Sequence, residues 1–247
     1  MLVKSQVNYI QSLSQKKIRE QEDVFVAEGP KIINELLGAG NTPLQHLYAT
    51  TEWMELNRQL LTKLEPGKLV IVKESELARI SFLSTPNQVL GVFAKPKFPF
   101  KFSLKGKLSL LLDTIQDPGN LGTIVRCADW FGVQQIVCTE DCADVFNPKT
   151  VQSTMGSISR VQVIYTDVLD LLEKNKNLPL YAAVLGGKDI HAYQKIKEGI
   201  VIIGNESKGI RSSLLALPVN KMTIPRKGGA ESLNAAVAAG IILSHLT

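Results

Sequence analysis

The chain has 247 residues, 45% of them hydrophobic, and its 28 lysines and arginines exceed its 23 acidic residues by a net charge of +5. This length is greater than that of most single domains, so we expect two domains with a core each. No apolar run approaches the ~18 residues of a membrane span, and residues 1–13 lack the apolar core of a signal peptide. These observations exclude an integral membrane protein and predict a soluble, cytoplasmic protein with no membrane partner.

The cysteines do not suggest a metal centre. Cys127, Cys138 and Cys142 are an odd number, and no histidine lies close to the last two in sequence to complete a zinc-ligand pattern. We expect free thiols and no metal cofactor.

The first part of the chain has the pattern of a small α/β domain. Short apolar runs predict four strands, at Val24–Glu28, His46–Ala49, Leu69–Val72 and Val89–Phe93. Helical spacing predicts helices over Lys31–Leu37 and Glu52–Leu64. Residues 1–96 are therefore expected to form one domain.

A basic segment follows this domain. It contains five lysines and no acidic residue: Lys95, Lys97, Lys101, Lys105 and Lys107. Pro96 and Pro99 lie among them, and proline removes a backbone donor, so regular structure should lapse there. We expect a linker over residues 97–106, whose lysines either neutralise the phosphates of a polyanion or are simply solvated.

The remainder, residues 107–247, alternates between apolar runs and helix-like segments. The expected strands are Leu108–Leu112, Gln135–Cys138, Val161–Tyr165, Leu180–Val184, Ile200–Ile203 and Met222–Ile224. The expected helices are Leu121–Phe131, Pro148–Gly156, Val168–Lys174 and Ser232–Leu246. Such alternation is typical of a mostly parallel sheet covered by helices on both faces.

Three of the expected strands end in glycine-rich turns, over residues 183–187, 203–209 and 224–229. Ligands of open α/β sheets bind outside the carboxyl ends of the strands, so these turns predict one composite pocket, with ordinary tight turns as the alternative. The sequence has no G-x-G-x-x-G after a strand, no P-loop, no G-x-S-x-G and no H-E-x-x-H. A dinucleotide-dependent dehydrogenase, a P-loop NTPase and the common hydrolases are therefore disfavoured.

Three segments carry a more specific resemblance. They are Asn120–Arg126, Gly204–Gly209, and Ile224-Pro225 followed by Ser232-Leu233-Asn234. In this order and spacing they resemble the three signature motifs of the SpoU/TrmH family of RNA 2′-O-ribose methyltransferases, within the SPOUT superfamily. A weaker resemblance over Arg19–Leu37 is to the substrate-binding domain that precedes the catalytic domain in many members.

The resemblance implies a fold and an activity. The fold would be a C-terminal α/β-knot domain, with a deep trefoil knot and a mostly parallel sheet, preceded by a small α/β domain that binds RNA. The enzyme would be a homodimer that transfers a methyl group from S-adenosylmethionine to a ribose 2′-hydroxyl, without a metal. Large-subunit (23S) rRNA is the first expectation for the substrate. The alternatives are a tRNA 2′-O-methyltransferase, a knotted enzyme that methylates a base nitrogen, and a catalytically silent protein for rRNA binding or ribosome assembly.

The resemblance also assigns residues. The polar residues around the reacting ribose would be Arg126, Asn120, Glu206, Ser232 and Asn234. Those holding the methyl donor would be Leu185, Gly186, Ile203, Gly204, Ile224, Leu233 and Asn234. Arg226 departs from the pattern, because many relatives have an apolar residue after Ile-Pro, and its role is open.

Four assignments have alternatives in the chemistry of the side chains. Glu206 could hold an arginine, structure its loop or be an ordinary surface acid. Arg126 would act as a general base or as a clamp for an RNA phosphate, and arginine ordinarily keeps its proton while its planar donors suit a phosphate. Asn120 and Ser232 could instead serve only as N-caps of the helices that begin near them.

Overall fold

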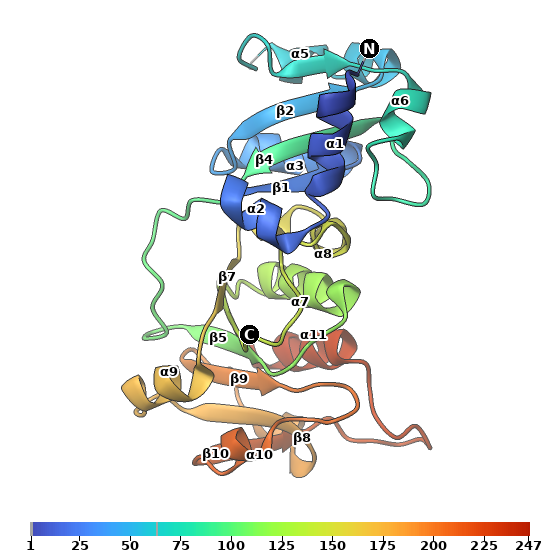
Figure 1. Cartoon of the computed structure of the whole chain (residues 1–247). Coiled ribbons are helices and arrows are strands. Elements are labelled where there is room, and N and C mark those ends of the chain that lie inside the picture. Colours follow the sequence, from blue (N-terminus) through green and yellow to red (C-terminus); the bar gives the residue numbers. More distant parts are fainter. Residues whose placement is uncertain (1, 63) are drawn as a thin grey trace. The chain divides into compact units, whose positions relative to one another are not determined.

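The structure, a computed structural model, describes residues 2–62 and 64–247, and these form two compact units (Figure 1). The first unit contains the chain up to residue 98 together with residues 146–159. The second contains residues 99–145 and 160–247. The expected helix over Pro148–Gly156 exists as α8 (Pro148–Thr154), but it packs against β1 (Val24–Glu28) of the first unit. Each unit is therefore made of two stretches that are separate in the sequence.

The first unit is built on a four-stranded sheet with the order β1-β4-β2-β3. Its strands besides β1 are β2 (Leu44–Ala49), β3 (Leu69–Ile71) and β4 (Val89–Ala94). β4 is antiparallel to both β1 and β2, whereas β2 and β3 are parallel. The helices of this unit besides α8 are α1 (Lys4–Ser12), α2 (Lys16–Glu22), α3 (Pro30–Ala39), α4 (Thr51–Leu56), α5 (Arg58–Leu61) and α6 (Glu74–Ala78). The strands expected from sequence are all present, within two residues at each end.

One expected helix of this unit is interrupted. The spacing of Glu52–Leu64 predicted a continuous helix, but α4 and α5 are separate, and residue 63 lies outside the described residues. Asn57 lies between them with φ −118°, and its Nδ2 donates to the carbonyl oxygen of Trp53 at 2.8 Å. Short polar side chains compete for backbone groups in this way and so end helices that spacing alone would continue.

The second unit contains a six-stranded sheet with the order β10-β8-β9-β5-β6-β7, in which every neighbouring pair is parallel. Its strands are β5 (Leu108–Leu112), β6 (Gln135–Cys138), β7 (Gln162–Tyr165), β8 (Leu180–Asp189), β9 (Gly199–Ile203) and β10 (Val219–Thr223). Its helices are α7 (Pro118–Trp130), α9 (Val168–Lys174), α10 (Ser212–Leu215) and α11 (Ala235–Leu246). β5 and β9 are buried along their whole length, as strands covered on both faces must be. The expected mostly parallel α/β sheet is confirmed.

The strand β8 is longer than expected and bulges in its middle. Ala182 pairs with Lys221, but the next pair is Lys188 with Met222, so residues 183–187 have no partner in β10 and leave the sheet. Gly187 permits this path, because a Cβ there would lie 2.7 Å from the carbonyl carbon of Lys221. The bulge directs the residues before Gly187 away from the ladder and toward the edge where β9 and β10 end.

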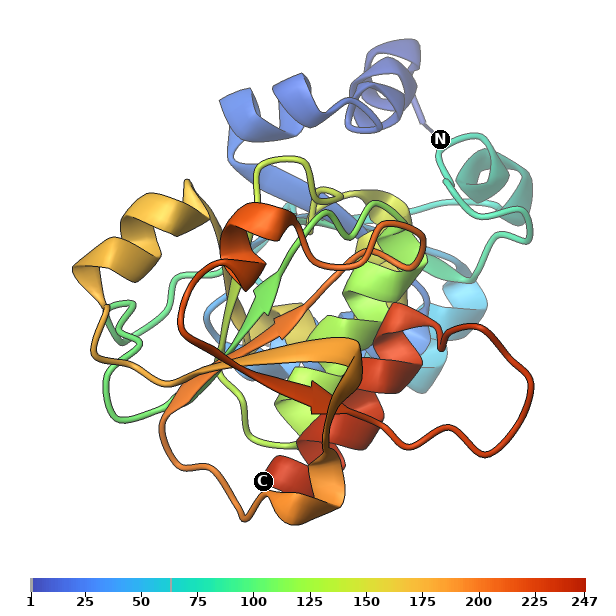
Figure 2. The ribbon, with the colours of Figure 1, turned by 90° about the horizontal axis from the view of Figure 1, so that it is seen from below.

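The helices α7 and α11 pack against each other (Figure 2). Gly240 lies close to α7, since a Cβ on it would be in van der Waals contact with Cys127 Sγ at 3.5 Å. Asp117 caps α7 by accepting from the Asn120 amide at 2.8 Å. Asn234 caps α11 by accepting from two amides of its first turn. The alternative that Asn120 and Ser232 are themselves the caps is therefore wrong, because Asp117 and Asn234 occupy those positions.

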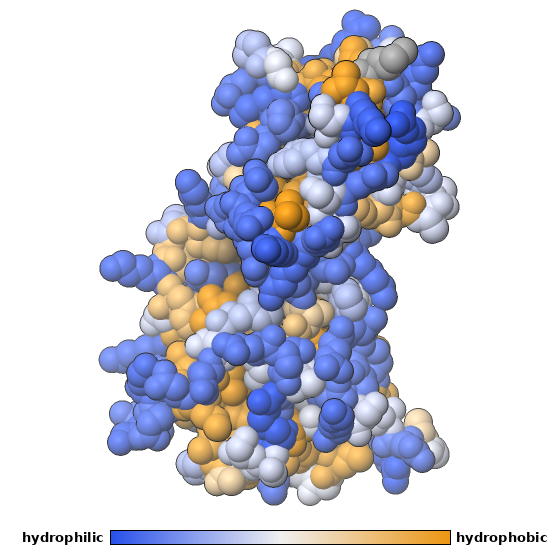
Figure 3. Space-filling view, in the orientation of Figure 1, coloured by the Kyte–Doolittle hydropathy of each residue, from blue (hydrophilic) through white to orange (hydrophobic). Residues whose placement is uncertain are grey.

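Both hydrophobic and hydrophilic side chains reach the surface (Figure 3). On the face drawn in Figure 3, hydrophilic side chains interrupt the hydrophobic ones on both units. No helix in residues 2–62 and 64–247 is long and apolar enough to cross a membrane.

Candidate active site

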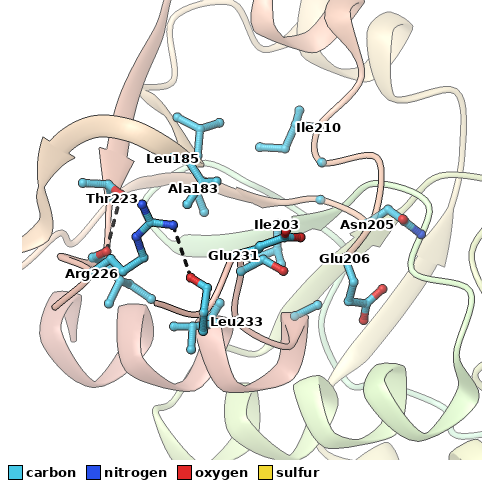
Figure 4. Close-up of a pocket in the computed structure, with 18 of the residues that line it drawn as sticks. Ala183, Leu185, Ile203, Asn205, Glu206, Ile210, Thr223, Arg226, Glu231 and Leu233 are labelled. Atoms are coloured by element: carbon cyan, nitrogen blue, oxygen red, sulfur yellow. Dashed lines mark hydrogen bonds between the residues drawn. The ribbon is translucent and has the colours of Figure 1, made fainter. Parts of the chain in front are cut away.

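A cavity of about 700 Å³ lies beside the bulge of β8 and the carboxyl ends of β9 and β10 (Figure 4). Its wall combines residues of the three glycine-rich segments that the sequence singled out, over residues 183–185, 203–210, 222–228 and 230–233, and α11 contributes Ala235 and Ala238. Most of the lining is apolar, with polar groups gathered on the turns after β9 and β10. The expected composite pocket is thus present in the structure, at the edge of the sheet where open α/β folds bind ligands.

The turn after β9 is held in shape by its own asparagine. Asn205 forms a backbone bridge with Gly209, and its side-chain oxygen accepts from the amides of Ser207 and Lys208. Its Nδ2 donates to the carbonyl oxygen of Thr114 at 2.9 Å. Gly204 is required here, because a Cβ would lie 2.4 Å from the carbonyl carbon of Gly209. The turn therefore packs closely on its own backbone at this point.

A buried ion pair anchors the end of the same loop. Asp113, whose side chain is 1% exposed, accepts from Arg211 Nε at 2.6 Å and from the Arg211 amide at 2.7 Å. Arg211 also reaches Asp141 at 3.2 Å. These contacts raise the pKa of Arg211 against the opposing effect of burial. Sequence analysis did not identify Asp113 and Arg211, since they are 98 residues apart and belong to no recognised motif.

One chain of hydrogen bonds connects the three motifs. Asn120, on α7, donates from Nδ2 to Oε1 of Glu206. The other end of the same amide, Asn120 Oδ1, accepts from Asn234 Nδ2 at 2.9 Å. Each motif contributes one member, and Glu206 also lines the cavity. The structure thus joins the three polar residues at the border of the cavity and fixes the orientation of the Asn120 amide, which donates at one end and accepts at the other.

The remaining candidate residues take three kinds of position. Five of those expected to hold the methyl donor line the cavity: Leu185, Ile203, Gly204, Ile224 and Leu233. Gly186 lies in the bulge of β8 with φ +75° but is not part of the lining, and Ser232 is an exposed lining residue. Arg126 is exposed on α7, outside the cavity lining, and forms no hydrogen bond or ion pair with any described residue.

The basic segment is not uniform. Lys97, Lys101 and Lys105 are exposed, whereas Lys95 lies 3.6 Å from Asp23 and faces the ring of Phe146. The ammonium of Lys107 lies 4.9 Å from the centre of the Phe100 ring. Three of the five lysines are therefore open to a polyanion, and the other two have partners in the protein.

The cysteines are free thiols. Burial raises the pKa of Cys138. A hydrogen bond with Cys138 lowers the pKa of Cys142 to about 7, although burial of Cys142 acts in the opposite direction. Within the described ranges, no group of three or more His, Cys, Asp or Glu residues is arranged to hold a metal ion.

Comparison with known proteins agrees with this geometry. The sequence model of the SpoU rRNA Methylase family matches residues 107–244, and that of the MRM3-like substrate binding domain matches residues 4–91. A relative from Bacillus subtilis (strain 168), the 23S rRNA (guanosine(2553)-2′-O)-methyltransferase RlmP, is 30% identical over 240 residues, covering 95% of this chain and 92% of that protein.

Solved structures show the same similarity. A putative RNA methyltransferase of the TrmH family from Porphyromonas gingivalis is 34% identical, with a TM-score of 0.84 over 99% of this chain and 97% of the other. An AdoMet-bound rRNA methyltransferase from Sinorhizobium meliloti is 30% identical, with a TM-score of 0.84 over 98% of this chain and 94% of the other. The chain belongs to the SpoU rRNA methylase family.

Proposed function

We propose that this protein transfers the methyl group of S-adenosylmethionine to a ribose 2′-hydroxyl of large-subunit rRNA. The observation that carries the proposal is the hydrogen-bonded chain Glu206–Asn120–Asn234 at the border of the cavity, because it brings together one polar residue from each family motif. A base-nitrogen methyltransferase is not expected to carry the motif that contains Asn120 and Arg126. A binding protein without catalytic activity would not need the hydrogen bonds that join Glu206, Asn120 and Asn234.

The cavity fits the methyl donor. Its volume of about 700 Å³ is within the range of small-molecule sites. Gly204 lines it, and the backbone of Gly209 packs so closely on Gly204 that no side chain fits there, so this part of the wall is backbone. Leu185, Ile203 and Leu233 offer apolar walls for an uncharged ring. S-adenosylmethionine supplies an activated methyl group on a sulfonium, and S-adenosylmethionine is present in the Sinorhizobium meliloti relative.

The residues of this chain would then position the acceptor. Asn120 and Glu206 are fixed relative to each other, so they can hold the ribose in line for transfer, and alignment of this kind lowers the barrier substantially. Arg126 is exposed and has no partner among the described residues, so its guanidinium is available to an RNA phosphate. We assign Arg126 the role of the clamp, because its planar pair of donors matches the geometry of a phosphate. Ser232 stands at the cavity wall, where its hydroxyl can contact the ribose.

The name of the Bacillus subtilis relative supports rRNA over tRNA as the substrate, because that enzyme is a 23S rRNA methyltransferase. The matched substrate-binding domain over residues 4–91 supports a large, structured RNA as well. We propose that residues 1–96 bind this RNA, that residues 97–106 form a basic linker, and that residues 107–247 carry catalysis. Mass spectrometry of rRNA nucleosides from cells with and without the protein tests the substrate: loss of one 2′-O-methylated nucleotide from large-subunit rRNA is expected, and loss from tRNA alone would contradict it.

The assembly is also part of the proposal. Val237 and Ile241 are large apolar residues, four positions apart on α11, that remain 50% and 37% exposed. Residues at this spacing share one face of a helix, and α11 already packs on α7 with its other side. We propose a cytoplasmic homodimer that buries this face, with the trefoil knot of the family in each C-terminal domain.

A further inference from the structure

Arg226 is the part of the cavity that the proposed reaction leaves unexplained. It follows β10 by three residues and lines the cavity, at a position where many family members have an apolar residue. In Figure 4 its guanidinium lies on the side of Thr223 and Leu185, while Glu206 lies on the opposite side. A charged side chain at this place must be solvated or must contact a ligand.

The loop holds the Arg226 side chain in a defined position. Pro225 fixes the backbone directly before it, and Arg226 Nη1 donates to the carbonyl oxygen of Ala230 at 3.3 Å. Within the described part of the chain, no carboxylate pairs with it. A guanidinium has five N–H donors, so one hydrogen bond leaves its flat face and most donors free.

The walls of the cavity near Arg226 indicate which part of the methyl donor reaches it. The methyl group is expected next to Glu206, which is hydrogen-bonded to Asn120 and lies on the side away from Arg226 in Figure 4. Either the adenosine or the methionine end of the donor could then extend toward Arg226. Leu185 and Leu233, which line this part of the cavity, are 71% and 45% exposed, so a planar apolar ring would cover them. A carboxylate between two leucines would lose hydration instead.

We propose that Arg226 stacks its guanidinium plane on the adenine ring of the methyl donor and so closes the base subsite of this enzyme. The guanidinium is planar and weakly hydrated and stacks on aromatic rings, which a lysine ammonium does less well. This inference rests on the proposed function, since it requires the cavity to be the site of S-adenosylmethionine.

Calorimetry with two ligands tests it in the full-length protein. S-adenosylhomocysteine contains adenine and a carboxylate, whereas 5′-methylthioadenosine contains the adenine without the carboxylate. Arg226→Ala should weaken both ligands by the same factor, roughly three- to thirty-fold from the usual strength of such stacking. Arg226→Lys should recover only part of this loss. Lys221→Ala removes the same charge from an exposed position of β10 that does not line the cavity, and it should change neither affinity by more than about twofold.

The other outcomes are distinct. If Arg226→Ala weakens S-adenosylhomocysteine alone, Arg226 binds the carboxylate and the stacking is wrong. If both affinities are unchanged and RNA affinity falls, Arg226 contacts RNA and the stacking is again wrong. An unchanged thermal midpoint of Arg226→Ala shows that the loss is local. If the unaltered protein binds neither ligand, the proposed function itself fails, and this result differs from every result of the variants.

Discussion

Asn120 and Glu206 are 86 residues apart in sequence, and the amide of the first donates directly to the carboxylate of the second. Asn234, a further 28 residues along the chain, donates to the other end of that amide. The side chain at position 120 must therefore donate one hydrogen bond, to Glu206, and accept another, from Asn234. A group that can only donate or only accept cannot do both. This requirement separates asparagine from aspartate at position 120.

Asn120→Asp should reduce kcat by about 100-fold, because two carboxylates would face each other and the acceptor site would lose its alignment. The affinity for S-adenosylhomocysteine should change little, since Asn120 does not line the cavity. Thr123→Ala is the matched control, because Thr123 lies on the exposed side of α7 and bonds only within the helix, to the Gly119 carbonyl. Steady-state kinetics on transcribed rRNA measure the effect. An unchanged kcat in Asn120→Asp would show that the hydrogen bonds between Glu206, Asn120 and Asn234 have only a structural role.

Arg126→Ala should lower turnover at least ~100-fold and leave donor affinity unchanged, because Arg126 lies on α7, outside the cavity lining. Arg126→Lys should recover little, since lysine keeps the charge but not the planar pair of donors. Single-turnover kinetics together with calorimetry separate the two effects. A collapse of donor affinity in Arg126→Ala would contradict the clamp.

Asp113→Asn should lower the free energy of unfolding by about 2 kcal/mol, because it leaves the Arg211 guanidinium without its buried partner. Asp170→Asn is the control, since Asp170 forms an exposed pair with Lys174 and should change stability by less than about 0.5 kcal/mol. Urea unfolding at neutral pH compares the two. Equal effects would mean that the Asp113 pair does not anchor the loop.

The same network should be sensitive to acid through Asp141. Burial on its own would raise the pKa of Asp141. The hydroxyls of Thr139 and Thr114 and the charge of Arg211 outweigh this effect and lower that pKa. A lowered pKa means that the contribution of Asp141 to stability is present above its unfolded value of about 3.9 and is lost as the pH falls through the folded value.

The pattern of the sequence predicted the second unit well because its central strands, β5 and β9, are buried on both faces and read as continuous apolar runs. It could not predict the bulge of β8, since pairing with β10 decides where that strand leaves the sheet. It left open whether Asn120 and Ser232 are N-caps, and the structure has Asp117 and Asn234 in those positions, because only the backbone path decides between neighbouring polar residues.

The residues of the site were likewise predicted only in part. The residues of the three motifs could be assigned by resemblance, and the glycine-rich turns by their place after strands. The pair Asp113–Arg211 could not be, because its two members are joined only by the parallel pairing of β5 and β9. A buried Asp directly after an apolar strand was the only available signal.

Replacing Lys95, Lys97, Lys101, Lys105 and Lys107 with glutamine should weaken RNA binding and flatten its dependence on salt. Each lost contact to a duplex phosphate should lower the slope of log affinity against log salt by about 0.9. Lys97, Lys101 and Lys105 should account for most of the change, because Lys95 and Lys107 already have partners. Exposed Lys174 and Lys176 of the α9 region, changed likewise, are the control. A slope equal to that of the unaltered protein would make the segment an ordinary linker.

The position of the transferred methyl group distinguishes methylation of a ribose 2′-hydroxyl from methylation of a base. Purified protein would be incubated with S-adenosylmethionine labelled in its methyl group and large-subunit rRNA, and the product hydrolysed in alkali. A methyl on the 2′-oxygen blocks cleavage of the adjacent 3′ linkage, so the account predicts label in alkali-resistant dinucleotides. Label that appears only in mononucleotides would place the methyl on a base and contradict the account.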